Sequence, residues 1–166
     1  TPAQKSKYSD LAKNLRLEGL ETTNSLDLML RLHQIAGGFL PKIVDGGTEY
    51  ENIGDGKMSE LINIAEDCEG QSIIVWCAYR HEIEHVVTRL RMCFGKSSVV
   101  EIHGGIDEKG RAESVSSIQS GKARFLVGIA SSGGVGVTAT AASVVVYYSN
   151  NFSYINRVQS VDRAHR

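Results

Sequence analysis

The sequence is poor in the residues that build metal sites and disulfide frameworks, and it has no long apolar run. Its three cysteines, Cys68, Cys77 and Cys93, form no Cys-x-x-Cys pair. The odd number and the spacing indicate neither a zinc site nor a disulfide framework, and we expect a reduced, intracellular protein. No apolar run approaches the roughly 20 residues of a membrane-spanning helix, so no membrane partner is predicted.

The chain also lacks a net charge of one sign. Its 18 Lys and Arg residues nearly balance its 19 Asp and Glu residues, for a formal charge of -1 at pH 7. The whole-chain charge therefore gives no sign of a nucleic-acid partner, and this test does not address a local basic patch. The first residues contain no apolar segment typical of a signal peptide, and the missing initiator Met predicts a fragment of a longer protein.

The first third of the chain is predicted to be an extension. Residues 1–24 are polar and are interpreted as mobile chain with one helical turn. Residues 25–36 carry two sets of apolar side chains at helical spacing, which predicts a helix that is packed on most of its circumference. Residues 44–56 are rich in glycine and acidic residues and are expected to form an exposed loop. We therefore expect residues 1–56 to hold one packed helix and a loop.

From residue 57 onwards, helical and strand patterns alternate. Amphipathic or apolar patterns predict helices at 57–68, 83–94, 109–119 and from 154 onwards, and strands at 72–77, 99–102, 124–129 and 143–148. This order favours right-handed crossovers, and hence an α/β domain at 57–166 with a parallel sheet and helices on both faces. In such sheets, functional groups gather in the loops beyond the carboxyl ends of the strands.

A glycine-rich segment, SSGGVGVT at 131–138, follows the third predicted strand. Its glycines allow close backbone approach, and exposed N–H groups after a strand can bind phosphate. A plain flexible turn is the alternative. Gly134-x-Gly136-x-x-Ala139 also matches a dinucleotide fingerprint. Because the next strand ends in Ser149-Asn150, with no acid for the ribose, a dinucleotide- or nucleotide-binding domain is kept only as an alternative.

The sequence contains no Walker A motif. The chain by itself therefore cannot supply the lysine, the Mg²⁺-binding hydroxyl and the metal-orienting acid that nucleoside triphosphate hydrolysis needs. Near the end, Arg163 and Arg166 are three residues apart and would share a helix face. Two guanidinium groups on one face suit a phosphate, although a solvated basic helix end is the simpler interpretation.

Taken in order, the segments GGVGVT (133–138) and QSVDRAHR (159–166) look like motifs V and VI of a helicase. Upstream, IIVWCAY (73–79) looks like motif IV, and EIHGG (101–105) like the segment after it. Together these segments resemble the second, RecA-like lobe of superfamily 2 helicases of the Snf (chromatin-remodeller) type. The resemblance covers roughly residues 28–166.

The resemblance implies a role for each matching residue. Arg163 and Arg166 would act as arginine fingers on the γ-phosphate of an ATP, and Gln159 would couple their helix to the interface between the lobes. Gly134 and Gly136 would shape the loop near the nucleotide. ATP and Mg²⁺ would be held mainly by a separate first lobe of the same protein, so this chain alone is predicted to be inactive.

The resemblance also implies contacts with DNA, single- or double-stranded, that do not read its sequence. The residues implied in these contacts are Tyr79, Arg80, His103, Gly104, Gly105, Ser131, Ser132 and Gly133. Two departures stand out. Ser132 takes the place of the arginine that the family usually has before the Gly-Gly pair, and the chain ends at Arg166, before the usual Gly-Gln. A lobe retained only for docking to nucleic acid is therefore a further alternative.

Overall fold

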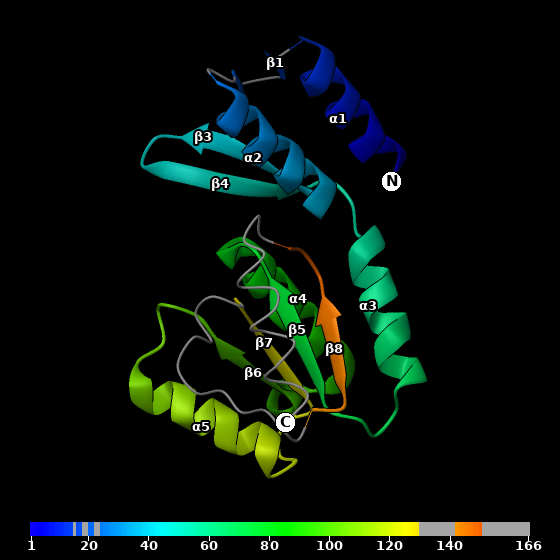
Figure 1. Ribbon diagram of the computed structural model, residues 1–166, viewed down its shortest axis with the longest axis vertical. Helices are drawn as coiled ribbons and strands as arrows, with labels where there is room; N and C mark the ends of the chain where they lie inside the picture. Colours follow the sequence, from blue (N-terminus) through cyan, green and yellow to red (C-terminus); the bar gives the residue numbers. More distant parts are fainter. Residues whose placement is uncertain (15, 18–19, 22–23, 130–141, 151–166) are drawn as a thin grey trace. The chain divides into compact units, whose positions relative to one another are not determined.

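The structure is a computed structural model, which describes residues 1–14, 16–17, 20–21, 24–129 and 142–150. The chain forms two compact units, Thr1–Glu60 and Leu61–Arg166. Helix α3 (Gly56–Asp67) spans the boundary between them (Figure 1). The boundary expected from the sequence, between residues 56 and 57, falls at the start of this helix. Within the described ranges, no helix is both long and apolar enough to cross a membrane.

The first unit contains the predicted helix, α2 (Ser25–Gly37). It begins where the side chain of Asn24 accepts a hydrogen bond from the backbone N–H of Asp27, at 2.9 Å. It ends at Gly38, whose φ of +98° is the left-handed conformation that glycine adopts without a steric penalty. The prediction of a helix at 25–36 is confirmed.

The prediction of mobile chain at 1–24 is wrong. The segment forms helix α1 (Pro2–Asn14), followed by the short paired strands β1 (Arg16–Leu17) and β2 (Leu20–Glu21). Leu11 is the buried residue of α1, and it packs in a cluster with Ile35 and Leu40. A helix that buries so few side chains has no repeated apolar spacing in its sequence, which is why the pattern did not reveal it.

The exposed loop predicted at 44–56 is also wrong. Strands β3 (Phe39–Val44) and β4 (Gly47–Asn52) form an antiparallel hairpin in which Val44 pairs with Gly47. The connection is therefore the two-residue turn Asp45-Gly46, and Gly46 has a φ of +105°. Asp-Gly is a preferred sequence for such turns. The residues of β4 are all exposed, so no alternation of apolar and polar residues marks the strand.

The second unit confirms the predicted alternation of strands and helices. Its elements after α3 are β5 (Ile73–Cys77), α4 (Arg80–Phe94), a 3-10 turn (Lys96–Ser98), β6 (Val99–Ile102), α5 (Glu108–Gln119), β7 (Phe125–Ile129) and β8 (Val144–Tyr147). The described strands lie in the order β6-β7-β5-β8, and every pairing between them is parallel. The helix expected from residue 154 lies outside the described residues.

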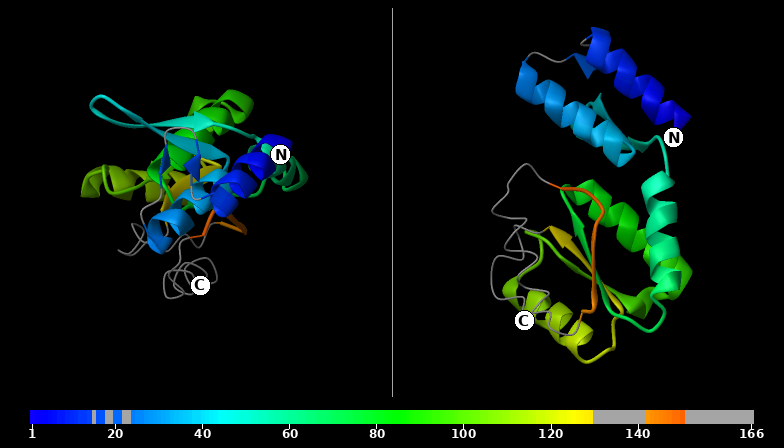
Figure 2. Two further views of the ribbon diagram at one scale, coloured as in Figure 1. Left: turned by 90° about the horizontal axis from the view of Figure 1, so that it is seen from above. Right: turned by 45° about the vertical axis from the view of Figure 1, so that its right-hand side comes forward.

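Helices α4 and α5 cover opposite faces of this sheet. The connection through α4 leads from β5 outward to β6, whereas the connection through α5 leads back from β6 to β7. Two right-handed crossovers in opposite directions place their helices on opposite faces, as Figures 1 and 2 show. On the α5 face, Ile118 packs in one core cluster with Ile74, Trp76 and Leu126.

Gly128 allows strands β6 and β7 to approach closely. A Cβ atom at this position would lie 2.5 Å from the carbonyl oxygen of Ile102 and 3.4 Å from the ring of Trp76. Gly128 pairs with Ile102 in the parallel ladder. The obstacle is therefore backbone, which cannot rotate away as a side chain can, and the position requires glycine.

Arg124 holds the carboxyl end of α3 against the sheet. Its guanidinium group donates hydrogen bonds to the carbonyl oxygens of Ala65, Cys68 and Gln71, the last two at 2.8 and 3.1 Å. The same group lies 5.4 Å from the ring centre of Phe94 and 4.9 Å from that of Phe125. The last carbonyl groups of a helix have no partner within the helix, so this arginine stabilises the end of α3.

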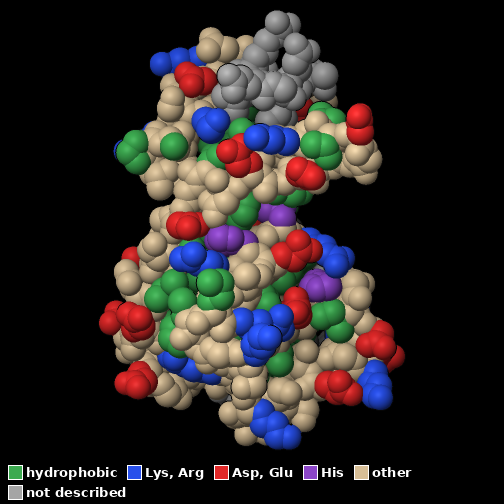
Figure 3. All heavy atoms as spheres, turned by 180° about the vertical axis from the view of Figure 1, so that it is seen from behind, with side chains coloured by type: hydrophobic (Ala, Val, Ile, Leu, Met, Phe, Trp, Pro, Cys, Tyr) green, Lys and Arg blue, Asp and Glu red, His purple; other side chains and the backbone are tan. Residues whose placement is uncertain are grey.

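Charged side chains of both signs are mixed on the face seen from behind in Figure 3, where Lys and Arg lie among Asp and Glu. This mixture matches the nearly balanced composition of the chain. In parallel α/β folds, binding sites are formed by a few groups at the carboxyl ends of the strands.

Candidate nucleic-acid interface

Strands β5, β6, β7 and β8 end at nearly the same level of the sheet. At their carboxyl ends, Cys77 pairs with Ile129 and Ile102 pairs with Gly128. The described segments that follow β5, β6 and β8 therefore begin along one edge of the sheet. This edge is where parallel α/β folds bind ligands.

A buried carboxylate holds the segments after β5 and β8 together. Glu82, in the first turn of α4, is 0% exposed. It accepts hydrogen bonds from the backbone N–H groups of Ala78 and Tyr79, both at 3.1 Å, and from the hydroxyl of Ser149. The Ser149 oxygen in turn accepts a hydrogen bond from the Ala78 N–H at 2.7 Å. The path of the chain into α4 is therefore tied to the end of β8.

Tyr79 and Arg80 lie at the start of α4. The Tyr79 ring stacks on that of His81, with ring centres 5.3 Å apart. Burial lowers the pKa of His81 to about 4, against the opposite effect of the nearby Glu84 carboxylate. The Arg80 side chain is 63% exposed, and its Nε lies 3.3 Å from Glu84. Such an exposed pair is weak, so the Arg80 guanidinium can exchange Glu84 for a phosphate.

The turn after β6 exposes two glycines above a buried histidine. His103 is 8% exposed, and its Nδ1 accepts a hydrogen bond from the Gly105 N–H at 3.0 Å. The carbonyl oxygen of His103 accepts another from the N–H of Ile106 at 3.1 Å. Gly104 and Gly105 are both exposed. Around a Cβ atom built on Gly104, no atom of the described residues lies within 4 Å.

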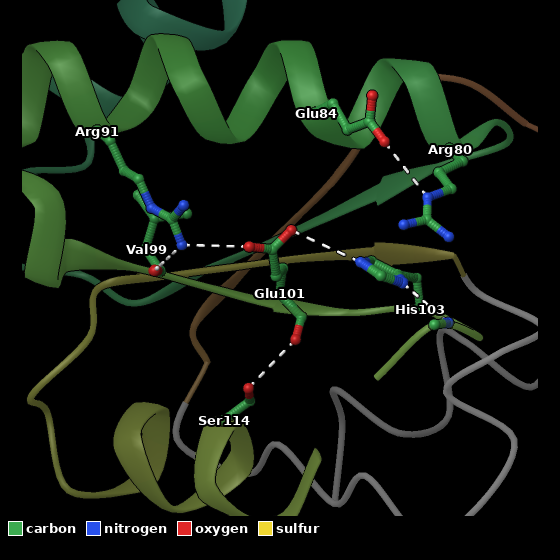
Figure 4. A network of polar contacts seen from close by, with 8 residues as sticks. Arg80, Glu84, Arg91, Val99, Glu101, His103 and Ser114 are labelled. Atoms are coloured by element: carbon green, nitrogen blue, oxygen red, sulfur yellow. Dashed lines mark hydrogen bonds and ion pairs between the residues drawn. The ribbon is translucent and has the colours of Figure 1, made fainter. Parts of the chain in front are cut away.

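The structure brings Arg80 and this turn together. A Cβ atom on Gly105 would lie 2.9 Å from Nη1 of Arg80, so the guanidinium group lies against the glycine. Figure 4 shows Arg80 at the start of α4 on the same side as His103. An exposed cation and exposed peptide groups, supplied from the ends of two strands, are the groups that contact a nucleic-acid backbone.

A chain of polar contacts runs from α4 to His103 beneath the turn (Figure 4). Arg91 donates to a carboxylate oxygen of Glu101 at 3.2 Å and to the carbonyl oxygen of Val99 at 3.3 Å. The second carboxylate oxygen of Glu101 lies 3.7 Å from Nε2 of His103. The hydroxyl of Ser114, in α5, donates to the carbonyl oxygen of Glu101 at 3.1 Å. Helices on both faces therefore hold the end of β6.

The described structure thus contains five of the residues that the sequence proposed for this site. Tyr79 and Arg80 lie at the end of β5, and His103, Gly104 and Gly105 lie at the end of β6. The others fall outside the described residues, namely Ser131, Ser132, Gly133, Gly134, Gly136, Gln159, Arg163 and Arg166. Their roles stay predictions.

Sequence reasoning missed Glu82 and Ser149, which are 67 residues apart and meet only in the fold. In a capping box, the side chain of Glu at the third helical position accepts a hydrogen bond from the backbone N–H of the cap residue. That cap residue is normally Ser or Thr, which makes the motif visible in the sequence. Here Tyr79 is in that position, so the usual signal is missing. Among the described residues, no group of three or more His, Cys, Asp or Glu side chains could hold a metal ion.

The second unit, with its parallel sheet and its polar groups at the strand ends, has the RecA-like α/β architecture of a helicase lobe. Residues 56–166 match the family described as "helicase conserved C-terminal domain". Since this match covers more than half of the chain, the chain belongs to that family. None of the curated proteins matches the sequence.

Solved structures with the same fold come from SWI2/SNF2 ATPases. The ATPase core domain from Sulfolobus solfataricus has a TM-score of 0.72 and 22% identity, covering 100% of this chain and 36% of that one. The C-terminal domain of the Sulfolobus SWI2/SNF2 ATPase has a TM-score of 0.69 and 23% identity, with coverages of 90% and 68%. The core in complex with dsDNA has a TM-score of 0.64 and 21% identity, covering 89% and 31%. The chain therefore spans about a third of the ATPase cores.

Proposed function

We propose that this chain is the second motor lobe of an ATP-dependent DNA translocase or helicase of the Snf type. The observation that carries the proposal is the match of residues 56–166 to the helicase C-terminal family. The shared fold with SWI2/SNF2 ATPases supports the Snf-type assignment. In such a motor, two lobes close on ATP and reopen after hydrolysis, and the cycle moves them along the nucleic acid.

The ATP role follows from what the chain contains and lacks. Without a Walker A motif, it needs a separate first lobe to hold ATP and Mg²⁺. Arg163 and Arg166 would reach across to the γ-phosphate and stabilise the charge that develops in the transition state. Gln159 would couple these arginines to the interface, and Gly134 and Gly136 would shape the loop beside the nucleotide.

The DNA role is supported by the edge described above. Arg80 offers an exposed guanidinium group directly beside Gly105, and Gly104 and Gly105 are both exposed residues. Tyr79 lies next to Arg80, and Ser131, Ser132 and Gly133 follow β7, which ends at the same edge of the sheet. A Sulfolobus SWI2/SNF2 core of the same fold has been solved with dsDNA. We propose DNA as the partner of this chain too, bound through its phosphates.

The ATP role can be tested in the intact protein that contains this chain. Replacing Arg163 or Arg166 with Ala should lower kcat for ATP by a factor on the order of 10³ or more, because an arginine finger acts mainly in the transition state. KM should change little. Lys122→Ala, on an exposed turn, is the matched loss of a positive charge and should leave kcat unchanged. Full turnover in both arginine variants would refute the finger assignment.

The isolated 166-residue chain should bind DNA and hydrolyse no ATP. Measurable turnover by this chain alone would contradict the need for a first lobe. If the intact protein bound DNA without any ATPase activity, the chain would be a docking module. Such a module is the alternative raised by Ser132 at the position of the usual arginine.

A further inference from the structure

The imidazole of His103 lies beneath the turn and does not face outward. Its exposed fraction is 8%, and both ring nitrogens face groups of the protein. Nδ1 accepts from the Gly105 N–H at 3.0 Å, and Nε2 lies 3.7 Å from the Glu101 carboxylate. Figure 4 shows the ring between Glu101 and the turn. A ring in this position is poorly placed to touch a nucleic acid directly.

The hydrogen bond determines which nitrogen carries the proton. Because Nδ1 accepts from the Gly105 N–H, it has no hydrogen of its own, and the neutral ring carries its proton on Nε2. That N–H points toward Glu101, whose other carboxylate oxygen is held by Arg91 at 3.2 Å. Arg91, Glu101 and His103 thus form a line of contacts that ends at the backbone of Gly105.

The turn needs such a support because it contains two successive glycines. Glycine loses more conformational freedom on ordering than any other residue, and Gly104 has no neighbour within 4 Å of a built Cβ among the described residues. The hydrogen bond from the Gly105 N–H to the side chain of His103, two residues earlier, closes the turn. An Asn or Asp side chain makes the same i to i+2 closure in an Asx turn.

We propose that His103 is a positioning residue for a phosphate-binding turn. Its Nδ1 holds residues 103–106 in the one shape in which the Gly104 peptide and the Arg80 guanidinium face the same DNA phosphodiester. The inference rests on the proposed DNA role of this edge and adds a residue that acts without touching the ligand. It differs from the role that the family resemblance implied, which was direct contact by His103.

Two amide side chains separate positioning from direct contact. His103→Asn places an oxygen near the position of Nδ1 and keeps the closure to Gly105. His103→Gln places its amide near Nε2, toward Glu101, and loses that closure. Both are neutral, so the pair differs in which nitrogen is replaced and not in charge. Arg80→Ala reports whether the measurement senses this edge of the sheet.

The experiment measures binding of the 166-residue chain to a short DNA duplex of random sequence at low salt, with NMR signals of the Gly104 and Gly105 amides as a local readout. We expect His103→Asn to bind within about twofold of the wild type. His103→Gln and Arg80→Ala should each bind about tenfold more weakly, in line with the loss of one hydrogen-bonding group. In the wild type and not in His103→Gln, a scalar coupling should connect the Gly105 nitrogen to Nδ1. Thermal melting of each variant separates loss of binding from loss of folding.

Three results would overturn the proposal. Equal binding by the wild type and His103→Gln would show that the closure does not matter, while the DNA role would stand. Rescue by Gln and not by Asn would show that the Nε2 side is the functional one. No DNA binding by the wild-type chain would refute both this inference and the DNA role of the edge.

Discussion

Removal of the Arg124 side chain tests whether the end of α3 is held as the structure indicates. The guanidinium group donates to three carbonyl oxygens, those of Ala65, Cys68 and Gln71, and also contacts the rings of Phe94 and Phe125. All of these groups belong to the second unit. Arg124→Ala leaves the carbonyl oxygens to solvent and removes both ring contacts.

The expected loss follows from these contacts. Hydrogen bonds from a charged donor contribute about 1.5–3 kcal/mol each, and a cation over an aromatic ring about 0.5–1 kcal/mol where solvent has access. These terms do not add fully, because water replaces part of what is lost around a partly buried group. We expect Arg124→Ala to lower the free energy of unfolding by about 3 kcal/mol. Arg124→Lys should lose about half as much, because an ammonium group lacks the planar fork that reaches several carbonyls.

Urea unfolding followed by tryptophan fluorescence is a suitable assay. The chain has a single tryptophan, Trp76, which is 1% exposed in the core of the second unit. Its emission therefore reports on the unit in which Arg124 acts. With a denaturant slope of about 2 kcal/mol per M, the midpoint should fall by about 1.5 M in Arg124→Ala. Lys122→Ala, an exposed neighbour, should shift the midpoint by less than about 0.3 M.

A midpoint for Arg124→Ala as close to the wild type as that of Lys122→Ala would refute the reasoning. It would mean that solvent satisfies the carbonyl groups of α3 as well as the guanidinium does. An Arg124→Lys variant as unstable as Arg124→Ala would instead show that the fork geometry, and not the charge, provides the whole effect.

Two further predictions concern the sheet and the start of α4. Gly128→Ala should lower the free energy of unfolding by about 2 kcal/mol or more, because its Cβ would meet the Ile102 carbonyl oxygen. Gly104→Ala is the control, since a Cβ at position 104 has no atom of the described residues within 4 Å. Equal urea midpoints for the two variants would contradict the close approach of β6 and β7. The pKa of His81 is lowered from 6.5 to about 4, so below about pH 6.5 the unfolded chain takes up a proton that the folded chain does not, and stability falls with acidification. His81→Asn should show a smaller fall between pH 6.5 and 4 in thermal melts, and an unchanged pH profile would argue against this cause.

The second unit could be predicted from the sequence because its signals are local. Strand β5 is a run of apolar residues that are all buried, as expected for a strand covered on both faces. Helix α4 repeats apolar residues at helical spacing and buries Ile83, Val86, Val87 and Leu90. A parallel sheet then follows from the alternation of such elements. The pairing order still required the structure, since no local pattern indicates that β7 lies between β5 and β6.

Apart from helix α2, which was predicted, the elements of the first unit were missed because they leave little trace in the pattern of apolar residues. Helix α1 buries Leu11 and has no repeated apolar spacing, and β4 is exposed along its length. The available signal was Asp45-Gly46, a turn sequence typical of two-residue hairpins. Pro41 is tolerated in β3, since a strand in a two-stranded sheet has one free edge.

The candidate site could be predicted as far as its residues follow a strand directly. Tyr79, Arg80 and the turn at His103 come after β5 and β6, and the rule on strand ends places them together. The orientation of His103 could not be predicted, because it depends on Glu101, whose carboxylate is in turn held by Arg91 from helix α4. For the same reason the Glu82–Ser149 contact has no counterpart in the sequence pattern.

The open surroundings of Gly104 make it a suitable attachment point for a spectroscopic label. Its backbone is outside the left-handed region, and a side chain added there would extend into free space among the described residues. Once the exposed Cys93 is changed to Ser, a cysteine introduced at position 104 could carry a fluorophore or a spin label. Distances measured from that label would follow this edge of the sheet through a reaction cycle.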